Sequence, residues 1–391
     1  MNTSASASSL SGDSSIDREN DETGLKYGIY WVTLVEWPAT SSGSANQTLI
    51  SLSLDLGDGL GALIALVLAA VLVVVAMPPL MRKMKAGGMV GRDVNKRSKH
   101  SVPELGGIAA LFAFSVSVSF VVGLQKLLGN VGEDPFLAAI SVFFMAAMVG
   151  LIDDISNLKQ RLKAIVVGFA ALPLMLVHLG PEIVDLPFGW QVDLTGHLYL
   201  IYWLLLVPLG VTGLANAMNM SAGYNGLESG QIAVVAGSLL AIGLLRPVPD
   251  YAFMIFAALM GCAIGLYYFN RFPARVFIGD IGTLGLGAAL AAGIVLGHLE
   301  FYGFVAIAPA FYEATATVYY GIGHKNGERR TACKNPILSP DGRLSPPEGA
   351  GRYTLAYFIL SRHAMTEKNL VRTLLVLYLI SGFVAILLSV L

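Results

Sequence analysis

Charged residues are scarce in this chain. Asp, Glu, Lys and Arg make up 13% of its 391 residues, whereas a soluble domain carries about 25%. Hydrophobic residues account for 55%, and the mean hydropathy is +0.67. This composition excludes an intrinsically disordered protein and indicates a membrane protein. The formal net charge is only −1, so the total charge gives no reason to expect a nucleic-acid partner.

Cysteine is scarcer still, with Cys262 in an apolar run and Cys333 in a polar loop. Two cysteines in such different surroundings exclude a disulfide framework, and the sequence has no Cys/His cluster with metal-ligand spacing. The phosphate-binding loop G-x-x-x-x-G-K-[ST] is also absent, which excludes ATP-driven transport based on that motif.

The apolar residues are gathered in ten stretches that lack Asp, Glu, Lys and Arg, apart from Glu313 in the ninth. A helix needs about 20 apolar residues to span a bilayer, or about 17 in short cases. The sequence therefore predicts an all-α integral membrane protein with about ten transmembrane helices. The stretches are 59–81, 105–125, 135–152, 164–181, 194–227, 229–245, 251–270, 281–299, 301–321 and 373–391.

Basic residues are unevenly divided between the loops. Ten crossings place alternate loops on the same side, and the loops of one side carry 21 of the 25 basic residues. The positive-inside rule therefore predicts a multi-pass protein with these loops in the cytoplasm and both termini outside, in the cell membrane of a prokaryote or the endoplasmic reticulum of a eukaryote. Residues 1–58 are expected to form a polar, partly disordered extracytoplasmic extension, and 59–391 the membrane domain. The cytoplasmic loops are 82–102, 153–163, 216–228, 271–280 and 322–372.

The 153–163 loop begins with two adjacent carboxylates, Asp153 and Asp154, at the end of a predicted helix. Two carboxylates at a membrane border repel each other and lose solvation, so they favour a bound cation. Asn157 shares a helix face with Asp153 and adds an oxygen donor of the kind that Mg²⁺ prefers. Basic residues follow, as expected for phosphate counter-charges: Lys159, Arg161 and Lys163. An ordinary charged helix end is the alternative explanation.

Two further loops carry amide and carboxylate side chains. One face of a helix that leaves the bilayer carries Asn216, Asn219 and Gly223, at positions i, i+3 and i+7. The side-chain amides of the two asparagines suit ribose, a base edge or a metal. Asp280 opens the eighth predicted helix, between two glycines and after Arg275. A helix cap would explain a lone aspartate there.

The first cytoplasmic loop adds bases together with Asp93 and Asn95, and Glu104 lies at the opening of the helix that follows. The 322–372 loop is long enough for a small lid or strand pair, and His324, Arg329 and Arg330 could bind phosphate there. Several acidic or amide clusters with bases between them, all on one side, favour phosphate chemistry at the membrane surface. A lipid or solute transporter remains the alternative, although it would carry polar residues near the bilayer midplane.

These residues resemble the motifs of the polyprenyl-phosphate N-acetylhexosamine-1-phosphate transferases, integral membrane enzymes with ten helices and cytoplasmic active-site loops. The resemblance covers the chain beyond its N-terminal extension. The matching segments are Pro103-Glu104-x-Gly106-Gly107, Asp153-Asp154-x-x-Asn157-Leu158-Lys159-x-Arg161, Asn216-Ala217-x-Asn219-x-x-Ala222-Gly223-x-Asn225-Gly226-Leu227-Glu228 and Pro273-Ala274-x-Val276-Phe277-x-Gly279-Asp280.

Within that superfamily, Asn225-Gly226 and the segment 366–370 resemble the eukaryal and archaeal branch, since bacterial members more often have Asp-Gly. The resemblance implies transfer of GlcNAc-1-phosphate from UDP-GlcNAc to dolichyl phosphate, with release of UMP, as the first step of lipid-linked oligosaccharide assembly for N-glycosylation. Another UDP-N-acetylhexosamine, an undecaprenyl phosphate acceptor and a homodimeric assembly stay open.

The resemblance also implies roles for single residues. Asp280 and Asn219 would hold Mg²⁺, with Mn²⁺ as an alternative, against the donor diphosphate. The residues expected to act on the phosphates as catalytic groups are Asp153, Asp154, Asn157 and Lys159. The residues expected to bind the substrates, including the bases named above, are Glu104, Asn216, Gly223, Asn225, Glu228, Arg161, Arg275, His324, Arg329 and Arg330.

Overall fold

The structure is a computed structural model, and it describes most of the chain beyond the N-terminal segment. The expected polar extension therefore lies almost entirely outside the described part. The described residues are 58–96, 101–128, 132–156, 158–177, 183–322, 335–351 and 353–391.

Eight helices in this part of the chain are long and apolar enough to cross a membrane. The uncharged stretches fold as helices because a helix satisfies its own backbone hydrogen bonds, which a bilayer interior cannot do. The chain is an all-α integral membrane protein, as predicted. The spans are α1 (Asp58–Ala86), α2 (Gly107–Leu128), α3 (Asp134–Ser156), the run of α6 (His197–Ile201), η3 (Tyr202–Leu206) and α7 (Val207–Met220), α8 (Leu227–Leu245), α9 (Asp250–Asn270), α10 (Gly279–Leu296) and α15 (Glu367–Ser389).

Two of the ten predicted spans are interrupted helices rather than single long ones. In each, a proline lies in the first turn after the interruption, Pro173 in one and Pro309 in the other. Proline has no N–H to donate and its ring clashes with the preceding turn, so it favours a kink or break in a helix, although Pro78 and Pro79 lie inside the continuous helix α1. The first span consists of α4 (Gln160–Gly168), η1 (Phe169–Ala171) and α5 (Leu172–Val177), and the second of α11 (Glu300–Ala306) and α12 (Ala308–Ile322).

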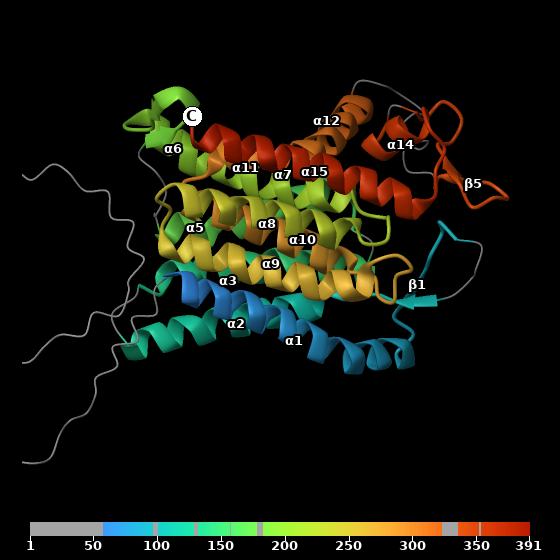
Figure 1. Cartoon of the computed structure of the whole chain (residues 1–391), viewed down its shortest axis with the longest axis horizontal. Helices are drawn as coiled ribbons and strands as arrows, with labels where there is room; N and C mark the ends of the chain where they lie inside the picture. Colours follow the sequence, from blue (N-terminus) through green and yellow to red (C-terminus); the bar gives the residue numbers. More distant parts are fainter. Residues whose placement is uncertain are drawn as a thin grey trace, which may run out of the picture. The chain divides into compact units, whose positions relative to one another are not determined.

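The helix α10 is the most buried of the spans. In the apolar segment of α10, 89% of the residues are buried, compared with 33% of the residues in the corresponding segments of α1 and α15. It packs against α2, α3, α7 and α9, and it lies among them in Figure 1. Several other helices therefore lie close to the first turn of α10.

Glycines bring α2 and α3 close to the start of α10. A Cβ atom on Gly150 of α3 would overlap the backbone of Asp280, and one on Gly107 of α2 would overlap Gly282. Because no side chain separates these helices, their backbones pack directly on each other. This contact sets the end of α3, with its two aspartates, against the beginning of α10.

Short strand pairs lie at the helix ends. The pair β1–β2 and the pair β5–β6 lie at the end where α15 begins, while α6 and the C-terminus lie at the other end (Figure 1). The β5–β6 pair confirms the strand pair that the length of the last loop predicted. Here Glu313 of α12 accepts a hydrogen bond of 2.8 Å from the Leu355 N–H, at the start of α14. The elements are β1 (Val90–Arg92), β2 (Ser101–Pro103), β3 (Ile183–Asp185), β4 (Gln191–Asp193), β5 (Ile337–Leu338), β6 (Leu344–Ser345) and α14 (Leu355–Leu360).

Candidate active site

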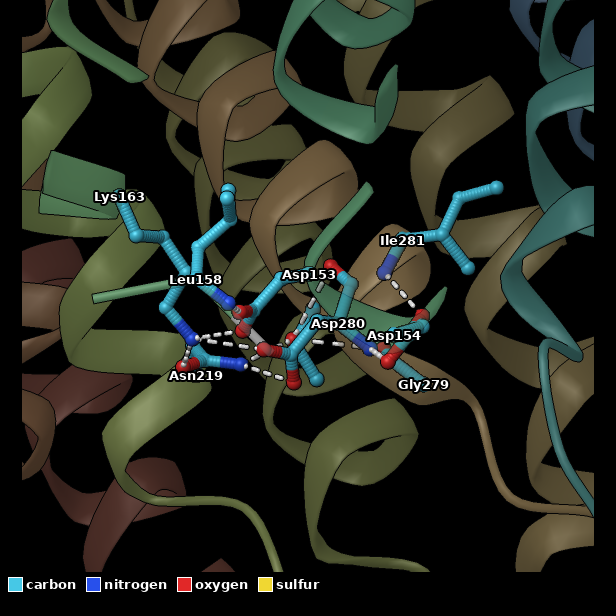
Figure 2. A network of polar contacts seen from close by, with 9 residues as sticks. Asp153, Asp154, Leu158, Lys163, Asn219, Gly279, Asp280 and Ile281 are labelled. Carbon is cyan, nitrogen blue, oxygen red and sulfur yellow. Dashed lines mark hydrogen bonds and ion pairs between the residues drawn. The ribbon is translucent and has the colours of Figure 1, made fainter. Parts of the chain in front are cut away.

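Lys163 is the centre of a buried cluster of charged side chains (Figure 2). Its ammonium group donates a hydrogen bond to Asp153 Oδ2 at 2.7 Å and another to Asp280 Oδ2 at 2.6 Å. It also donates to the amide oxygen of Asn219 at 3.2 Å. The four side chains come from α4, α3, α10 and α7. One ammonium between two carboxylates leaves the cluster with a net charge of −1, which still favours a further cation.

Asn219 fixes the carboxylate of Asp280 from the opposite side. Its Nδ2 donates to Asp280 Oδ1 at 2.7 Å and to the hydroxyl of Thr283 at 2.9 Å. Thr283 lies on α10 close to Asp280, so α10 orients the amide nitrogen, while Lys163 of α4 donates to the amide oxygen. Both oxygens of Asp280 therefore have partners, one from α7 and one from α4.

The adjacent aspartates of α3 have different partners (Figure 2). Asp153 Oδ1 accepts a hydrogen bond of 2.6 Å from the Leu158 N–H, which closes the turn between α3 and α4. Asp154 accepts from the N–H groups of Asp280 and Ile281 at 2.9 and 3.1 Å. A carboxylate at a helix N-terminus satisfies free N–H groups and opposes the helix dipole. Asp154 thus fixes the first turn of α10, and Asp153 fixes Lys163.

A cavity of about 260 Å³ lies beside this cluster. Asp280 lines it, with 28% of its side chain exposed. Its walls come from β1 and the loop after it, the segment before α2, the end of α3, the loop between α7 and α8, the start of α8 and the start of α10. Most of its side chains are polar, among them Asp93, Asn95, Glu104, Asp154, Asn225, Glu228 and Thr283.

Hydrogen bonds fasten two loops together around this cavity. Asn95 Nδ2 donates to the carbonyl of Gly223 at 2.9 Å, and Asn225 Nδ2 donates to Asp93 Oδ2 at 2.8 Å. Asn225 is held from α15 as well, because its N–H donates to Glu367 Oε1 at 2.8 Å. The loop after α7 is thus built into the wall by residues distant in sequence.

Two buried acceptors of the cavity have no hydrogen-bond partner among the described residues. They are Asn95 Oδ1 and Glu228 Oε2. The other oxygen of Glu228 accepts from the Gly223 N–H at 2.9 Å, so the carboxylate is fixed while its second oxygen is free. A buried acceptor without a partner is costly. The cavity is therefore suited to a ligand that carries O–H or N–H groups.

Glu104 lies on the wall near Asp280. Its burial, together with the negative charge of Asp280, raises the pKa of the Glu104 carboxyl above its ordinary value. The cavity is thus an acidic environment that resists further negative charge. An anionic ligand would need a compensating cation there.

The structure brings together eight of the predicted site residues. Four of them are in or directly beside the Lys163 cluster, and the other four line the cavity but are not part of the cluster. The first group is Asp153, Asp154, Asn219 and Asp280, and the second is Glu104, Gly223, Asn225 and Glu228.

Three predicted residues lie elsewhere. The side chain of Asn216 donates to the Thr212 carbonyl of its own helix at 2.8 Å and does not line the cavity. Lys159 is exposed and has no ion pair with the described residues. Arg275 is exposed and lines a different cavity. Asn157, His324, Arg329, Arg330 and the side chain of Arg161 lie outside the described residues.

Sequence reasoning noted Lys163 only as a counter-charge and assigned it no role. It is the last charge before the apolar stretch 164–181, so its ammonium group must find partners at that helix end. Asp93, Asn95 and Glu367 were likewise not assigned. Nothing in their spacing links them to Gly223 or Asn225, because those contacts join distant loops.

The donor set allows a divalent cation only if a ligand completes it. Within the described ranges, no three His, Cys, Asp or Glu side chains form a group that could hold a metal ion alone. Mg²⁺ is commonly held by one or two carboxylates together with substrate phosphates and water. The oxygens of Asp280 and Asn219, next to an open cavity, fit that pattern.

Comparison with known proteins agrees with this arrangement. The family model for glycosyl transferase family 4 matches residues 136–298, which carry the cluster. A protein of Saccharolobus solfataricus, provisionally named UDP-N-acetylglucosamine–dolichyl-phosphate N-acetylglucosaminephosphotransferase, is 31% identical over 241 residues, 61% of this chain and 68% of that protein. A provisionally named glycosyltransferase of Methanocaldococcus jannaschii is 31% identical over 312 residues, 79% of this chain and 91% of that protein. The phospho-N-acetylmuramoyl-pentapeptide-transferase of Streptococcus gordonii is 29% identical over 255 residues, 61% and 75% of the two chains.

The fold and the site define an all-α integral membrane protein with an acidic cluster at its helix ends. The chain belongs to glycosyl transferase family 4, and with it to the superfamily of polyprenyl-phosphate N-acetylhexosamine-1-phosphate transferases that its motifs resemble.

Proposed function

We propose that this chain transfers GlcNAc-1-phosphate from UDP-GlcNAc to dolichyl or another polyprenyl phosphate and releases UMP. The observation that carries the proposal is the Lys163 cluster beside the polar cavity of about 260 Å³. The name of the Saccharolobus solfataricus relative, which specifies this donor and acceptor, supports it.

The cavity suits the nucleoside of the donor. Glu228 Oε2 and Asn95 Oδ1 are buried acceptors that ribose hydroxyls or a base N–H would satisfy. Gly223 presents backbone with no side chain toward the cavity, and its φ of 110° favours glycine at that position. The diphosphate would then extend toward Asp280.

The reaction needs charge compensation more than it needs a strong base. The acceptor phosphate is already anionic near neutral pH, and the barrier is its repulsion by the donor phosphates. Asp280 and Asn219 would hold Mg²⁺, which supplies positive charge against both phosphates when bound. Lys163 provides a fixed positive charge beside them.

We propose direct in-line transfer. An acceptor phosphate oxygen forms a bond to the β-phosphorus of the donor, the bond from that phosphorus to the oxygen bridging to the α-phosphate breaks, and the electron pair leaves with UMP. Asp154 holds the first turn of α10 in place during this step, because it accepts from two of its N–H groups. A phosphorylated Asp153 trapped with donor alone would contradict direct transfer.

An apolar cavity offers a place for part of the acceptor chain. It has a volume of about 370 Å³ and lies between α7, α10 and α11, with Gly213 and Ile294 in its walls. Gly213 precedes Asn219 by six residues on α7, about 9 Å along the helix. Ile294 follows Asp280 by 14 residues on α10, about 21 Å along the helix, so the cavity would hold a distal part of the polyprenyl chain, with its phosphate end beyond Gly213.

The orientation in the membrane is part of the proposal. The helix end that carries the cluster also carries the loops with 21 of the 25 basic residues. The positive-inside rule therefore supports a cytoplasmic active site and an extracytoplasmic N-terminus.

Purified full-length protein tests the proposal directly. UMP release from UDP-GlcNAc and dolichyl phosphate is expected, with loss of the reaction on removal of Mg²⁺ by a chelator. Asp280→Asn should lower the rate by at least about 100-fold, because it removes a charge at the reacting phosphates. Asp134→Asn, an exposed carboxylate at the far end of α3, is the matched control and should retain the wild-type rate.

A second candidate is the transfer named for the Streptococcus gordonii relative, phospho-N-acetylmuramoyl-pentapeptide. A panel of UDP-sugars and of dolichyl and undecaprenyl phosphate, assayed on the same preparation, distinguishes the two. Release of UMP only with the muramoyl-pentapeptide donor would overturn the GlcNAc proposal. Failure to release UMP from any donor would favour a transporter.

A further inference from the structure

A second and larger cavity lies at the same end of the helices. Its volume is about 680 Å³, and it lies between the end of α9, the loop that follows and the start of α15. Within the described ranges, no aspartate or glutamate lines it. Its charged residues are all basic: Arg271, Arg275, Lys368 and Arg372.

These four bases have no ion pair with any carboxylate in the part of the chain that the structure describes. Aromatic rings orient two of them instead. The guanidinium of Arg275 lies 4.7 Å from the ring centroid of Tyr268, and that of Arg271 lies 5.5 Å from the same ring. Arg275 Nη2 donates to the Tyr268 carbonyl at 2.6 Å, which leaves its other N–H groups for a ligand.

The position of the cavity indicates which phosphates can reach it. The helices α9 and α15 are both long and apolar enough to cross the membrane, and the cavity lies where one ends and the other begins. That places it at the depth of the lipid headgroups. Tyr267, Tyr268 and Phe272, exposed by 36%, 47% and 38%, line it in the manner of an interfacial aromatic belt.

This cavity is separate from the candidate active site. Asn225 is the one lining residue that the two share in the described chain, and its side chain is turned toward Asp93. The charges are opposite, since carboxylates dominate one cavity and arginines and lysine the other.

We propose that the basic cavity binds the headgroup phosphate of an anionic membrane phospholipid. Arginine binds phosphate oxygens through two parallel N–H groups, and basic pockets between transmembrane helices bind anionic headgroups. The aromatic side chains would contact the glycerol backbone and upper acyl chains. This assignment does not depend on the proposed transfer reaction. A soluble phosphate shares the same chemistry, so the experiment compares both sources.

The test measures lipid binding to the delipidated full-length protein by native mass spectrometry. Palmitoyl-oleoyl phosphatidylglycerol is titrated against the matched phosphatidylcholine, and UMP and inorganic phosphate are titrated separately. Each basic residue near an anionic lipid contributes about fivefold in affinity. The double variant Arg271→Gln/Arg372→Gln should therefore bind phosphatidylglycerol about 25-fold more weakly, with phosphatidylcholine unchanged.

The control is Lys83→Gln/Lys85→Gln, which removes two exposed charges from the last turn of α1, also at the β1 end of the chain. It should leave phosphatidylglycerol affinity within about twofold of wild type, since surface charges away from a pocket contribute little. Lys368→Gln, also at an exposed position, should lose about fivefold. These expected losses do not require transferase activity.

Three results would overturn the proposal. Equal affinity of the wild type for the two lipids is one, and full retention of phosphatidylglycerol binding in both cavity variants is another. The third is loss of UMP or inorganic phosphate binding in the variants with lipid binding intact, which would assign the cavity to a soluble phosphate.

Discussion

Two cavities at one end of the helices differ in the sign of the charges that line them. In the smaller one, carboxylates such as Asp154, Glu228 and Asp280 predominate, and in the larger one all charges are basic. Asn225 lies between them and lines both. The two sites would therefore bind phosphate in different ways.

The acidic cavity holds its carboxylates in fixed positions. Asp154 accepts from backbone N–H groups of α10, and Glu228 accepts from the Gly223 N–H. Preorganised negative charge repels a phosphate unless a cation is present, which suits a site that must release its product. The basic cavity has no such requirement, since unpaired arginines attract phosphate directly. The first arrangement favours turnover and the second favours retention.

The largest effect is expected from Lys163→Met. This change removes the single positive charge between the buried Asp153 and the partly exposed Asp280 and leaves their two carboxylates without the ammonium that joins them. The proposed transfer should fall by about 100- to 1,000-fold, because fixed charge at the reacting phosphates is lost. The rate of UMP release measures it.

Lys83→Met is the matched control, because Lys83 lies in the last turn of α1, is exposed and has no ion pair with the described residues. Its rate should stay close to wild type. Phosphatidylglycerol binding should be unchanged in both variants if the cavities are independent. A loss of lipid binding in Lys163→Met would show that the two sites form one electrostatic unit.

A smaller effect is expected from Gly150→Ala. The added methyl group would overlap the backbone of Asp280 and force α3 away from α10. Overpacking of this kind costs about 1–3 kcal/mol of unfolding free energy. Thermal unfolding should show a lower midpoint, and the transfer rate should fall because Asp153 and Asp154 move with α3.

Gly123→Ala provides the comparison on α2, since a Cβ there meets nothing within 4 Å. Alanine is the better helix former, so this variant should be neutral or slightly more stable. Neither variant should alter lipid binding at the basic cavity. An unchanged melting midpoint for Gly150→Ala would show that α3 and α10 separate without cost.

The membrane helices could be predicted because a span is a local property of composition. Their interruptions near Pro173 and Pro309 could not be predicted from proline alone, because Pro78 and Pro79 lie inside the unbroken helix α1. The clustering of Asp153, Asn219 and Asp280 was also predictable, because alternate loops must lie on the same side of the membrane.

Partners across distant loops could not be predicted in this way. Arg275 precedes Asp280 by only five residues, yet it lines the other cavity, because the chain turns between them and stacks the guanidinium on Tyr268. Lys163 needed the packing of α4 against α3 and α7, which no spacing reveals. Distance along the sequence indicates the side of the membrane, but not the cavity.

The smallest effect concerns Glu104 and appears only in the pH dependence of stability. Burial and the charge of Asp280 raise the pKa of the Glu104 carboxyl in the folded protein. Between its ordinary pKa of about 4.5 and that raised value, the folded state binds more protons than the unfolded state, so stability falls as pH rises. Glu104→Gln removes this loss. The variant and the wild type should therefore have nearly the same melting temperature below pH 4.5, and the variant should have the higher melting temperature at neutral pH.

Glu133→Gln should show the opposite sign. The exposed Glu133 is paired with Lys126 at 2.6 Å, and that hydrogen bond lowers the pKa of its carboxyl. The stabilisation of the folded protein by this ion pair is present above the ordinary pKa of the carboxyl and is lost as pH falls through the lowered pKa. The variant should then be slightly less stable than wild type at neutral pH and equal at low pH. Equal pH profiles for the two variants would mean that Glu104 is as well compensated as an exposed residue, and the acidic cavity would not need a cation to accept phosphate.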